Sequence, residues 1–188
     1  TGAAGSIGSE LVRQVAMRNP GGMILVDMAE SPLHDLTMDL RLQFPNLKFV
    51  HIIADVRDNT MIEPIFREYR PNIVFHAAAY KHVPLMEEFP TQAVMANVLG
   101  TKNVADLAIK YEVERFVMIS TDKAVNPTNI MGASKRIAEI YVQSLFLKTV
   151  QEKADCTKFI TTRFGNVLGS NGSVVPYFKK QIASGGPV

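Results

Sequence analysis

The stretch Thr1-Gly2-Ala3-Ala4-Gly5-Ser6-Ile7-Gly8 decides the fold class of this 188-residue chain. Its glycines at positions 2, 5 and 8 run directly into a helical pattern, in which Ile7, Leu11 and Val15 recur every fourth residue. Glycines permit a tight turn and let the backbone approach a pyrophosphate, and the free N–H groups at a helix start hold that anion. The stretch therefore predicts a dinucleotide-binding loop with contacts from Gly2, Gly5, Ser6, Ile7 and Gly8.

Acidic residues end the next two apolar runs. Asp27 lies 19 residues after Gly8, where a carboxylate accepts hydrogen bonds from both hydroxyls of an adenosine ribose. No Arg or Lys follows Asp27 for many residues, so a 2′-phosphate would meet an uncompensated carboxylate, and NAD is favoured over NADP. Asp55 is a candidate for the adenine amino group, with Val56 beside it. Both aspartates are also suited to a purely local role as loop or helix caps.

Five short apolar runs alternate with helical patterns along the chain. The runs are apolar continuously, which is typical of parallel strands covered on both faces. We predict strands over residues 23–27, 48–55, 72–78, 115–121 and 158–167, and helices over 6–18, 31–42, 58–69, 91–111 and 130–152. Val94, Val98, Val104 and Leu107 form the expected inner face of one helix, and Pro32 the expected first position of another. The alternation indicates an α/β fold with a doubly wound parallel sheet.

Composition excludes several classes of protein. Apolar residues make up 47% and charged residues 20%, and the formal charge of +2 is too small to argue for nucleic acid. The single cysteine, Cys156, excludes an internal disulfide and a multi-cysteine zinc site, and the four histidines show no HExxH spacing, so we expect no metal. No apolar run is long enough to span a bilayer, and we expect no signal peptide. We expect a cytoplasmic setting.

Both ends of the chain suggest an internal piece of a longer protein. The glycine loop has no strand before it, and the chain stops in a turn at residues 185–188. We therefore expect residues 1–188 to be a fragment of an NAD-binding domain that includes part of a substrate site. The first strand and a C-terminal substrate region are expected to lie outside it.

Four motifs carry a resemblance to a known family. They are residues 76–84 (HAAAYKHVP), 119–127 (ISTDKAVNP), 131–135 (MGASK) and 163–170 (RFGNVLGS). With the glycine loop, they resemble the nucleoside-diphosphate-sugar 4,6-dehydratases of bacterial polysaccharide biosynthesis, which are extended short-chain dehydrogenase/reductases with a Rossmann fold. The resemblance covers essentially the whole chain. It implies a lyase that uses bound NAD to oxidise C4 of UDP-N-acetylglucosamine, eliminates water across C5 and C6, and returns the hydride to C6. It also implies that the parent protein can be anchored to the inner membrane.

The resemblance places the elimination chemistry after the fourth run. It implies that Asp122 is the acid for the C6 hydroxyl and Lys123 the base for C5–H, while Thr121 is suited to orient the C4 oxygen. These roles need a protonated Asp122 and a neutral Lys123, so we expect desolvation to raise the pKa of Asp122 and lower that of Lys123. Neighbouring strand residues point to opposite faces, so the backbone must turn here for both side chains to face one sugar.

Lys135 and Met131 are the residues that the resemblance links to the hydride step. The resemblance places Lys135 at the nicotinamide ribose. Met131 stands where short-chain dehydrogenases usually carry a tyrosine, and methionine has no proton to exchange. The base for the C4 hydroxyl is therefore left open between Thr121 and a water molecule. Further cofactor contacts are expected from Ala77, Ala78, Ala79 and Asn97, and sugar or nucleotide contacts from Lys81, His82, Asn166 and Ser173.

Three activities remain open at this point. The first is 4,6-dehydration, and the second is a sugar-nucleotide 4-epimerase or a dehydratase that inverts C5. Asp122 and Lys123 favour elimination, because a plain 4-epimerase needs no acid for a C6 hydroxyl. The third is a non-catalytic NAD-binding module, which Met131 favours. A homo-oligomer is also left open.

Overall fold

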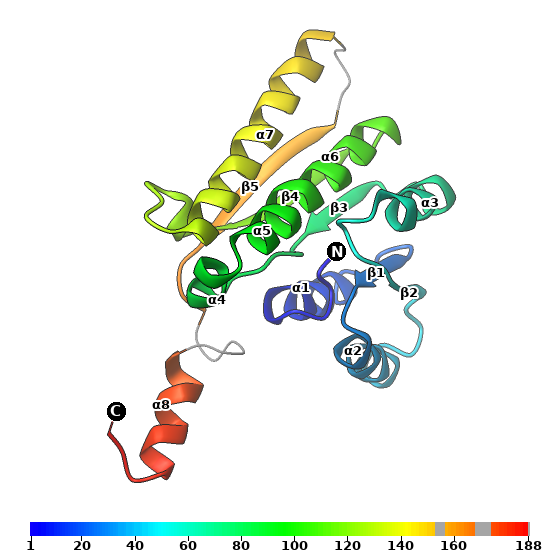
Figure 1. The fold of residues 1–188 in the computed structure, drawn as a ribbon. Coiled ribbons are helices and arrows are strands. Elements are labelled where there is room, and N and C mark those ends of the chain that lie inside the picture. The colour runs from blue at the N-terminus through cyan, green and yellow to red at the C-terminus, as the bar shows by residue number, and fades with distance from the viewer. Residues whose placement is uncertain (153–156, 168–173, 188) are drawn as a thin grey trace.

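The computed structural model describes residues 1–152, 157–167 and 174–187, and its strands alternate with helices along the chain (Figure 1). The strands are β1 (Met23–Asp27), β2 (Phe49–Ile53), β3 (Ile73–His76), β4 (Arg115–Thr121) and β5 (Lys158–Phe164). Every described strand pair is parallel, which confirms the α/β class. The predicted bounds of β1 and β4 are correct. The other three strands end earlier than predicted, because the chain turns away to form the loops at their carboxyl ends.

The helices follow the strands along the chain in the predicted order. They are α1 (Ser6–Ala16), α2 (Glu30–Gln43), α3 (Asn59–Tyr69), α4 (Val83–Glu88), α5 (Pro90–Ala93), α6 (Gly100–Lys110), α7 (Ile130–Glu152) and α8 (Val174–Ala183). The short helix α4 was not predicted. Helix α2 begins at Glu30, so Pro32 is its third residue and not its first. Proline is tolerated there because the N–H groups of the first turn have no partner within the helix.

The predicted helix over residues 91–111 is interrupted. A π-helical segment, Val94–Leu99, joins α5 to α6, and it buries Ala96 and Asn97. Val94, which we expected on the inner face, is 46% exposed, whereas Val104 and Leu107 are buried as expected. A π turn contains one more residue than an α-helical turn. The residues before it therefore point in other directions than they would in a regular helix, and Val94 no longer faces the core. Such segments are frequent at functional sites.

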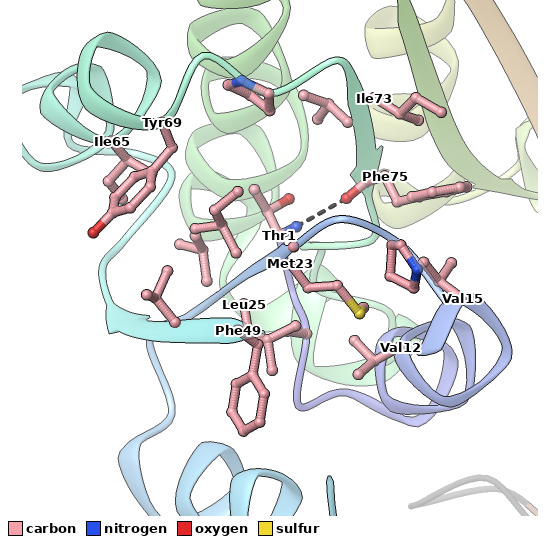
Figure 2. A pocket seen from close by; sticks show the side chains of 18 of the residues that line it. Thr1, Val12, Val15, Met23, Leu25, Phe49, Ile65, Tyr69, Ile73 and Phe75 are labelled. Carbon is pink, nitrogen blue, oxygen red and sulfur yellow. Dashed lines mark hydrogen bonds between the residues drawn. The ribbon is translucent and has the colours of Figure 1, made fainter. Parts of the chain in front are cut away.

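The strands form two parallel sheets with an apolar cavity between them. One sheet has the order β1-β2 and the other the order β3-β4-β5. The cavity has a volume of about 930 Å³ and is lined by residues including Val12, Met23, Phe49, Ile73 and Phe75, as Figure 2 shows. Residues 1–3 pass between the facing edges of β1 and β3. Thr1 bonds to the backbone of Phe75 and Ala77, and the N–H of Ala3 donates to the carbonyl of Val26. The glycine loop thus begins where the two sheets meet.

Two glycines of the loop are required by close backbone contacts. Gly2 has φ +67°, and a Cβ there would lie 2.4 Å from the nitrogen of Ala78. A Cβ on Gly8, in the first turn of α1, would lie 1.9 Å from the carbonyl oxygen of Gly2. Neither position accepts a side chain without moving the backbone. The glycine pattern therefore fixes how closely α1 and β3 approach the loop.

We predict that Gly8→Ala destabilises the protein, because the new methyl group displaces the backbone of Gly2. The expected loss is at least about 1–3 kcal/mol, the usual cost of overpacking. Denaturant unfolding measures it. Gly21→Ala is the matched control, since a Cβ at Gly21 meets no atom within 4 Å. Equal stability of the two variants would contradict the close contact.

Candidate functional site

Asp27 holds the glycine loop against the end of β1. Its Oδ2 accepts a hydrogen bond from the N–H of Ala4 at 2.8 Å, and its Oδ1 accepts one from the N–H of Ala29 at 2.9 Å. An ionised carboxylate offers about four acceptor positions, so two remain for a ligand. The local role and the ribose contact are therefore compatible at Asp27.

Asp55 is held by an arginine that the sequence analysis did not consider. The carboxylate of Asp55 accepts hydrogen bonds from the backbone N–H, Nε and Nη2 of Arg57. The Arg57 guanidinium lowers the pKa of Asp55 below its ordinary value. The next residue, Val56, is buried, and its carbonyl accepts a hydrogen bond from Asn103. The adenine contacts of Asp55 and Val56 stay predictions.

A buried histidine connects the glycine loop to α6. The Thr101 hydroxyl donates its single proton to the carbonyl of Asn97 at 2.6 Å, so it must accept from His76 Nε2–H at 3.0 Å. The other ring nitrogen, Nδ1, is then the acceptor for the Thr1 hydroxyl at 2.7 Å. Burial, followed by the charge of Lys135, lowers the pKa of His76 well below its ordinary value. His76 is thus neutral and relays one directed chain of hydrogen bonds.

Asn97 fixes the loop that follows β3. Its side-chain oxygen accepts from the N–H of Tyr80 at 2.8 Å, and its Nδ2 donates to the carbonyl of Tyr80 and to the hydroxyl of Ser134. The amide therefore joins the loop to the start of α7. In the same loop, the N–H of Ala77 donates to the carbonyl of Thr1, and Ala78 lies against Gly2. Ala79 is exposed. Cofactor contacts from Asn97 and the three alanines stay predictions.

A short 3₁₀ turn, Asp122–Ala124, brings Thr121, Asp122 and Lys123 together at the carboxyl end of β4. This is the backbone turn that we expected after Thr121. The hydroxyl of Thr121 donates to Asp122 Oδ1 at 2.9 Å. The ammonium of Lys123 donates to Asp122 Oδ1 and to the side-chain oxygen of Asn166, both at 3.1 Å. Acid, base and amide side chains thus lie within one hydrogen-bonded group, with Asn166 contributed by the segment after β5.

The expected rise in the pKa of Asp122 is wrong for this arrangement. The hydrogen bond from Thr121, followed by that from Lys123, lowers the pKa of Asp122 below its ordinary value. The Asp122 side chain is 55% exposed, so burial does little to oppose them. A protonated Asp122 therefore requires a change in its surroundings, such as desolvation by a ligand.

Lys135 is buried on α7, and its ammonium has no hydrogen-bond partner among the described residues. Its side chain lies one helical turn from Met131, and the residue is 4% exposed. Burial lowers the pKa of Lys135 to about 8, and the charge of Glu139 partly opposes this shift. Met131 itself is buried in a small apolar cluster with Met86 and Ala93. The position usually held by tyrosine thus contributes packing here.

Glu139 is a functional candidate that the sequence analysis missed. It lies one turn beyond Lys135, and its buried carboxylate accepts hydrogen bonds from Ser120, Arg136 and Arg163. Burial favours a higher pKa for Glu139, but these donors outweigh it and lower the pKa to about 2. The i, i+4 spacing from Lys135 and the quoted motifs, which contain Ser120 and Arg163, were the available signals.

The remaining predicted residues are exposed or lie outside the described part of the chain. Lys81 and His82 are exposed in the loop before α4. Ser173 and Cys156 lie outside the described residues. Within the described ranges, the structure contains no group of three His, Cys, Asp or Glu side chains suited to a metal ion. Nor does any described helix combine the length and apolar character that a membrane span needs.

Comparison with known proteins identifies relatives along the whole chain. The model of a family described as "Polysaccharide biosynthesis protein" matches residues 1–188. The capsular polysaccharide biosynthesis protein CapD of Staphylococcus aureus is 53% identical over 100% of this chain and 31% of its own length. A UDP-N-acetylglucosamine 4,6-dehydratase (inverting) of Campylobacter jejuni is 34% identical over 98% of this chain and 53% of its own length. The chain therefore spans about a third to a half of these relatives.

The fold agrees with that of solved nucleotide-sugar enzymes. The UDP-glucose 4-epimerase of Thermus thermophilus, solved in complex with NAD, superimposes with a TM-score of 0.80 at 27% identity, over 100% of this chain and 62% of that one. The likeness covers both sheets and the loops at their carboxyl ends. The α/β architecture is thus that of the extended short-chain dehydrogenase/reductases. With its full-length family match, the chain belongs to the polysaccharide biosynthesis protein family.

Proposed function

We propose that this chain carries the cofactor site and part of the sugar site of an NAD-dependent UDP-amino-sugar 4,6-dehydratase. UDP-N-acetylglucosamine is the proposed substrate. The observation that carries the proposal is the 3₁₀ turn after β4, where Asp122 and Lys123 form one hydrogen-bonded group with Asn166. An adjacent acid and base at the carboxyl end of a parallel strand suit the removal of water from a neighbouring sugar.

The described residues fit NAD in two independent respects. Gly2 and Gly8 bring the loop backbone close to the first turn of α1, and the N-cap residue Gly5 has no side chain to bond the N–H groups of that turn, which suits a pyrophosphate. Lys135 holds a buried ammonium that no described residue bonds, which suits the hydroxyls of a nicotinamide ribose. NAD, when bound, would take a hydride from C4 and return it to C6 in the same turnover. Asp27 would accept the hydroxyls of the adenosine ribose, which favours NAD over NADP.

The residues of this chain would move two protons in the elimination. Lys123 would take the proton from C5, and Asp122 would give a proton to the departing C6 hydroxyl. Substrate that separates Lys123 from Asp122 and excludes water would raise the pKa of Asp122 towards the protonated form. Thr121, whose hydroxyl already contacts Asp122, would orient the C4 oxygen.

One experiment distinguishes 4,6-dehydration from two other functions. Epimerisation at C4 would use the same cofactor site, and the buried position of Met131 in an apolar cluster favours a non-catalytic NAD-binding protein. The full-length protein is incubated with NAD and UDP-N-acetylglucosamine, and the nucleotide sugar is analysed by mass spectrometry. Dehydration removes the mass of one water, epimerisation leaves the mass unchanged but alters the sugar in NMR spectra, and a non-catalytic protein leaves the sugar unaltered.

We predict that Lys123→Ala abolishes dehydration and the incorporation of solvent deuterium at C5, because the proposed base is removed. NAD binding is expected to be retained, since Lys123 contacts Asp122 and Asn166 and not the glycine loop. Lys48→Ala, which changes an exposed lysine before β2, is the matched control. Deuterium exchange at the wild-type rate in Lys123→Ala would assign the base to another residue.

Met131→Leu should keep most of the activity. The side chain is 3% exposed, and leucine conserves its volume in the cluster with Met86 and Ala93. The measurement is kcat/KM for the dehydration. A loss beyond roughly a hundredfold, about 2.7 kcal/mol, would show that the thioether has a role besides packing.

Lys135→Met should stabilise the cofactor-free protein and weaken NAD binding, since it removes a buried ammonium that has no partner. The pKa of Lys135 falls from its ordinary value of 10.5 to about 8 on folding, so the unfolded chain binds more protons between these values. Wild-type stability should therefore rise relative to Lys135→Met as the pH increases from about 8 to 10.5. Urea unfolding of both proteins across this range provides the test. If the difference in unfolding free energy between the two proteins does not change with pH, the ammonium of Lys135 is in contact with solvent.

A further inference from the structure

Glu139 joins three elements beneath the candidate site. It is 0% exposed on α7 and accepts four hydrogen bonds. They come from Ser120 Oγ on β4 at 2.7 Å, from Arg163 Nε and Nη2 on β5 at 2.9 and 2.6 Å, and from Arg136 Nη1 on α7 at 3.0 Å. Ser120 immediately precedes Thr121, and Arg163 lies three residues before Asn166. The carboxylate therefore fixes the ends of β4 and β5 relative to α7.

The same hydrogen bonds determine how Glu139 acts on Lys135. Four donors occupy the acceptor positions of a carboxylate, so Glu139 is not paired with the ammonium one turn away. Within the part of the chain that the structure describes, the Nζ atom of Lys135 consequently has no hydrogen-bond partner. The negative charge of Glu139 still acts on the ammonium, because both residues are buried and lie one helical turn apart on α7. Burial lowers the pKa of Lys135 to about 8, and Glu139 keeps it from falling further.

The other titratable groups around Lys135 do not replace this charge. His76, on β3, interacts with Lys135 but is neutral because its own pKa is strongly lowered. Asp122 and Lys123, on the 3₁₀ turn that packs against α7, direct their side chains towards each other. Arg136 and Arg163 are cations bound to Glu139 itself. Glu139 is thus the acidic group that acts on Lys135.

We propose that Glu139 is a positioning residue, which ties the ends of β4 and β5 to α7 and supplies the buried negative charge beside Lys135. It keeps the lysine cationic and, because its own oxygens are taken, leaves the ammonium free for the cofactor ribose. The inference rests on the proposed function in one respect, since it takes Lys135 as the ribose contact. The effect of the Glu139 charge on the protonation of Lys135 does not depend on the proposed function.

The test is the titration of Lys135 in two variants of the full-length protein without cofactor. NMR of the lysine ε-methylene groups, assigned with Lys135→Arg, gives the titration midpoint. Glu139→Gln and Arg163→Gln each remove two of the four hydrogen bonds, but only the first removes the negative charge. We expect a midpoint near pH 8 in the wild type. We expect it to be about one unit lower in Glu139→Gln, and unchanged or higher in Arg163→Gln.

NAD binding gives the second measurement. Calorimetric titration at pH 7 and pH 9 should show a loss of affinity at the higher pH in the wild type. In Glu139→Gln, affinity should already be reduced about twofold at pH 7, because the protonated fraction of Lys135 falls from about nine tenths to about one half when its midpoint drops by one unit. A wild-type protein that does not bind NAD would contradict the proposed function and leave the NMR result intact.

Two results would overturn the inference. One is a Glu139→Gln midpoint equal to that of the wild type, and the other is the same downward shift in both variants, which a purely structural role predicts. If Glu139→Gln does not fold, the double variant Glu139→Met, Arg163→Met replaces the whole pair with apolar side chains, a change that buried ion pairs often tolerate. A lower Lys135 midpoint in the double variant supports the inference, and a wild-type midpoint refutes it.

Discussion

The close contact between the glycine loop and the end of β3 is the constraint on which the candidate site depends. Gly2, with φ +67°, lies directly against the backbone of Ala78, and the carbonyl of Thr1 accepts from Ala77. This contact fixes where the chain enters α1 and where the loop that contains Lys81 leaves β3. A side chain at Gly2 would force the glycine loop and the segment after β3 apart, and the loop would move relative to the start of α1.

Neutral and charged buried groups have different tasks in this arrangement. His76 is neutral, and its tautomer is fixed by the single proton of Thr101, so it connects the loop to α6 without placing a charge in the core. Glu139 is ionised, and its charge is matched by two arginines. Lys135 differs from both, because its buried ammonium has no hydrogen-bond partner among the described residues. Burying a cation without a partner costs stability, and such a cost is typical of positions that are prepared for a ligand.

Asp122 and Lys123, which follow β4, are by contrast paired with each other. Asp122 accepts hydrogen bonds from Thr121 and Lys123 and is largely exposed, so its pKa stays below the ordinary value and the cofactor-free protein keeps this carboxylate charged at neutral pH. Elimination needs a protonated Asp122 and a neutral Lys123. The proposed chemistry therefore depends on substrate to separate and desolvate the pair, whereas the cofactor side of the site is already arranged by the fold.

The sequence by itself determined the α/β class, the bounds of β1, β4 and α7, and the position of the glycine loop. These follow from local patterns, namely apolar runs, helical spacing and the steric needs of glycine, which act within a few residues. The sequence also placed Asp122 and Lys123 together, because they are neighbours in the chain. Only the tertiary structure decided the surroundings of each group. The donors from β4 and β5 around Glu139 and the contact of Lys123 with Asn166 depend on how separate elements pack, and they arise between segments far apart in the chain. The π turn that exposes Val94, the pairing of Asp55 with Arg57 and the lowered pKa of Asp122 arise between near neighbours, but they depend on the local backbone and side-chain geometry, which residue spacing does not contain.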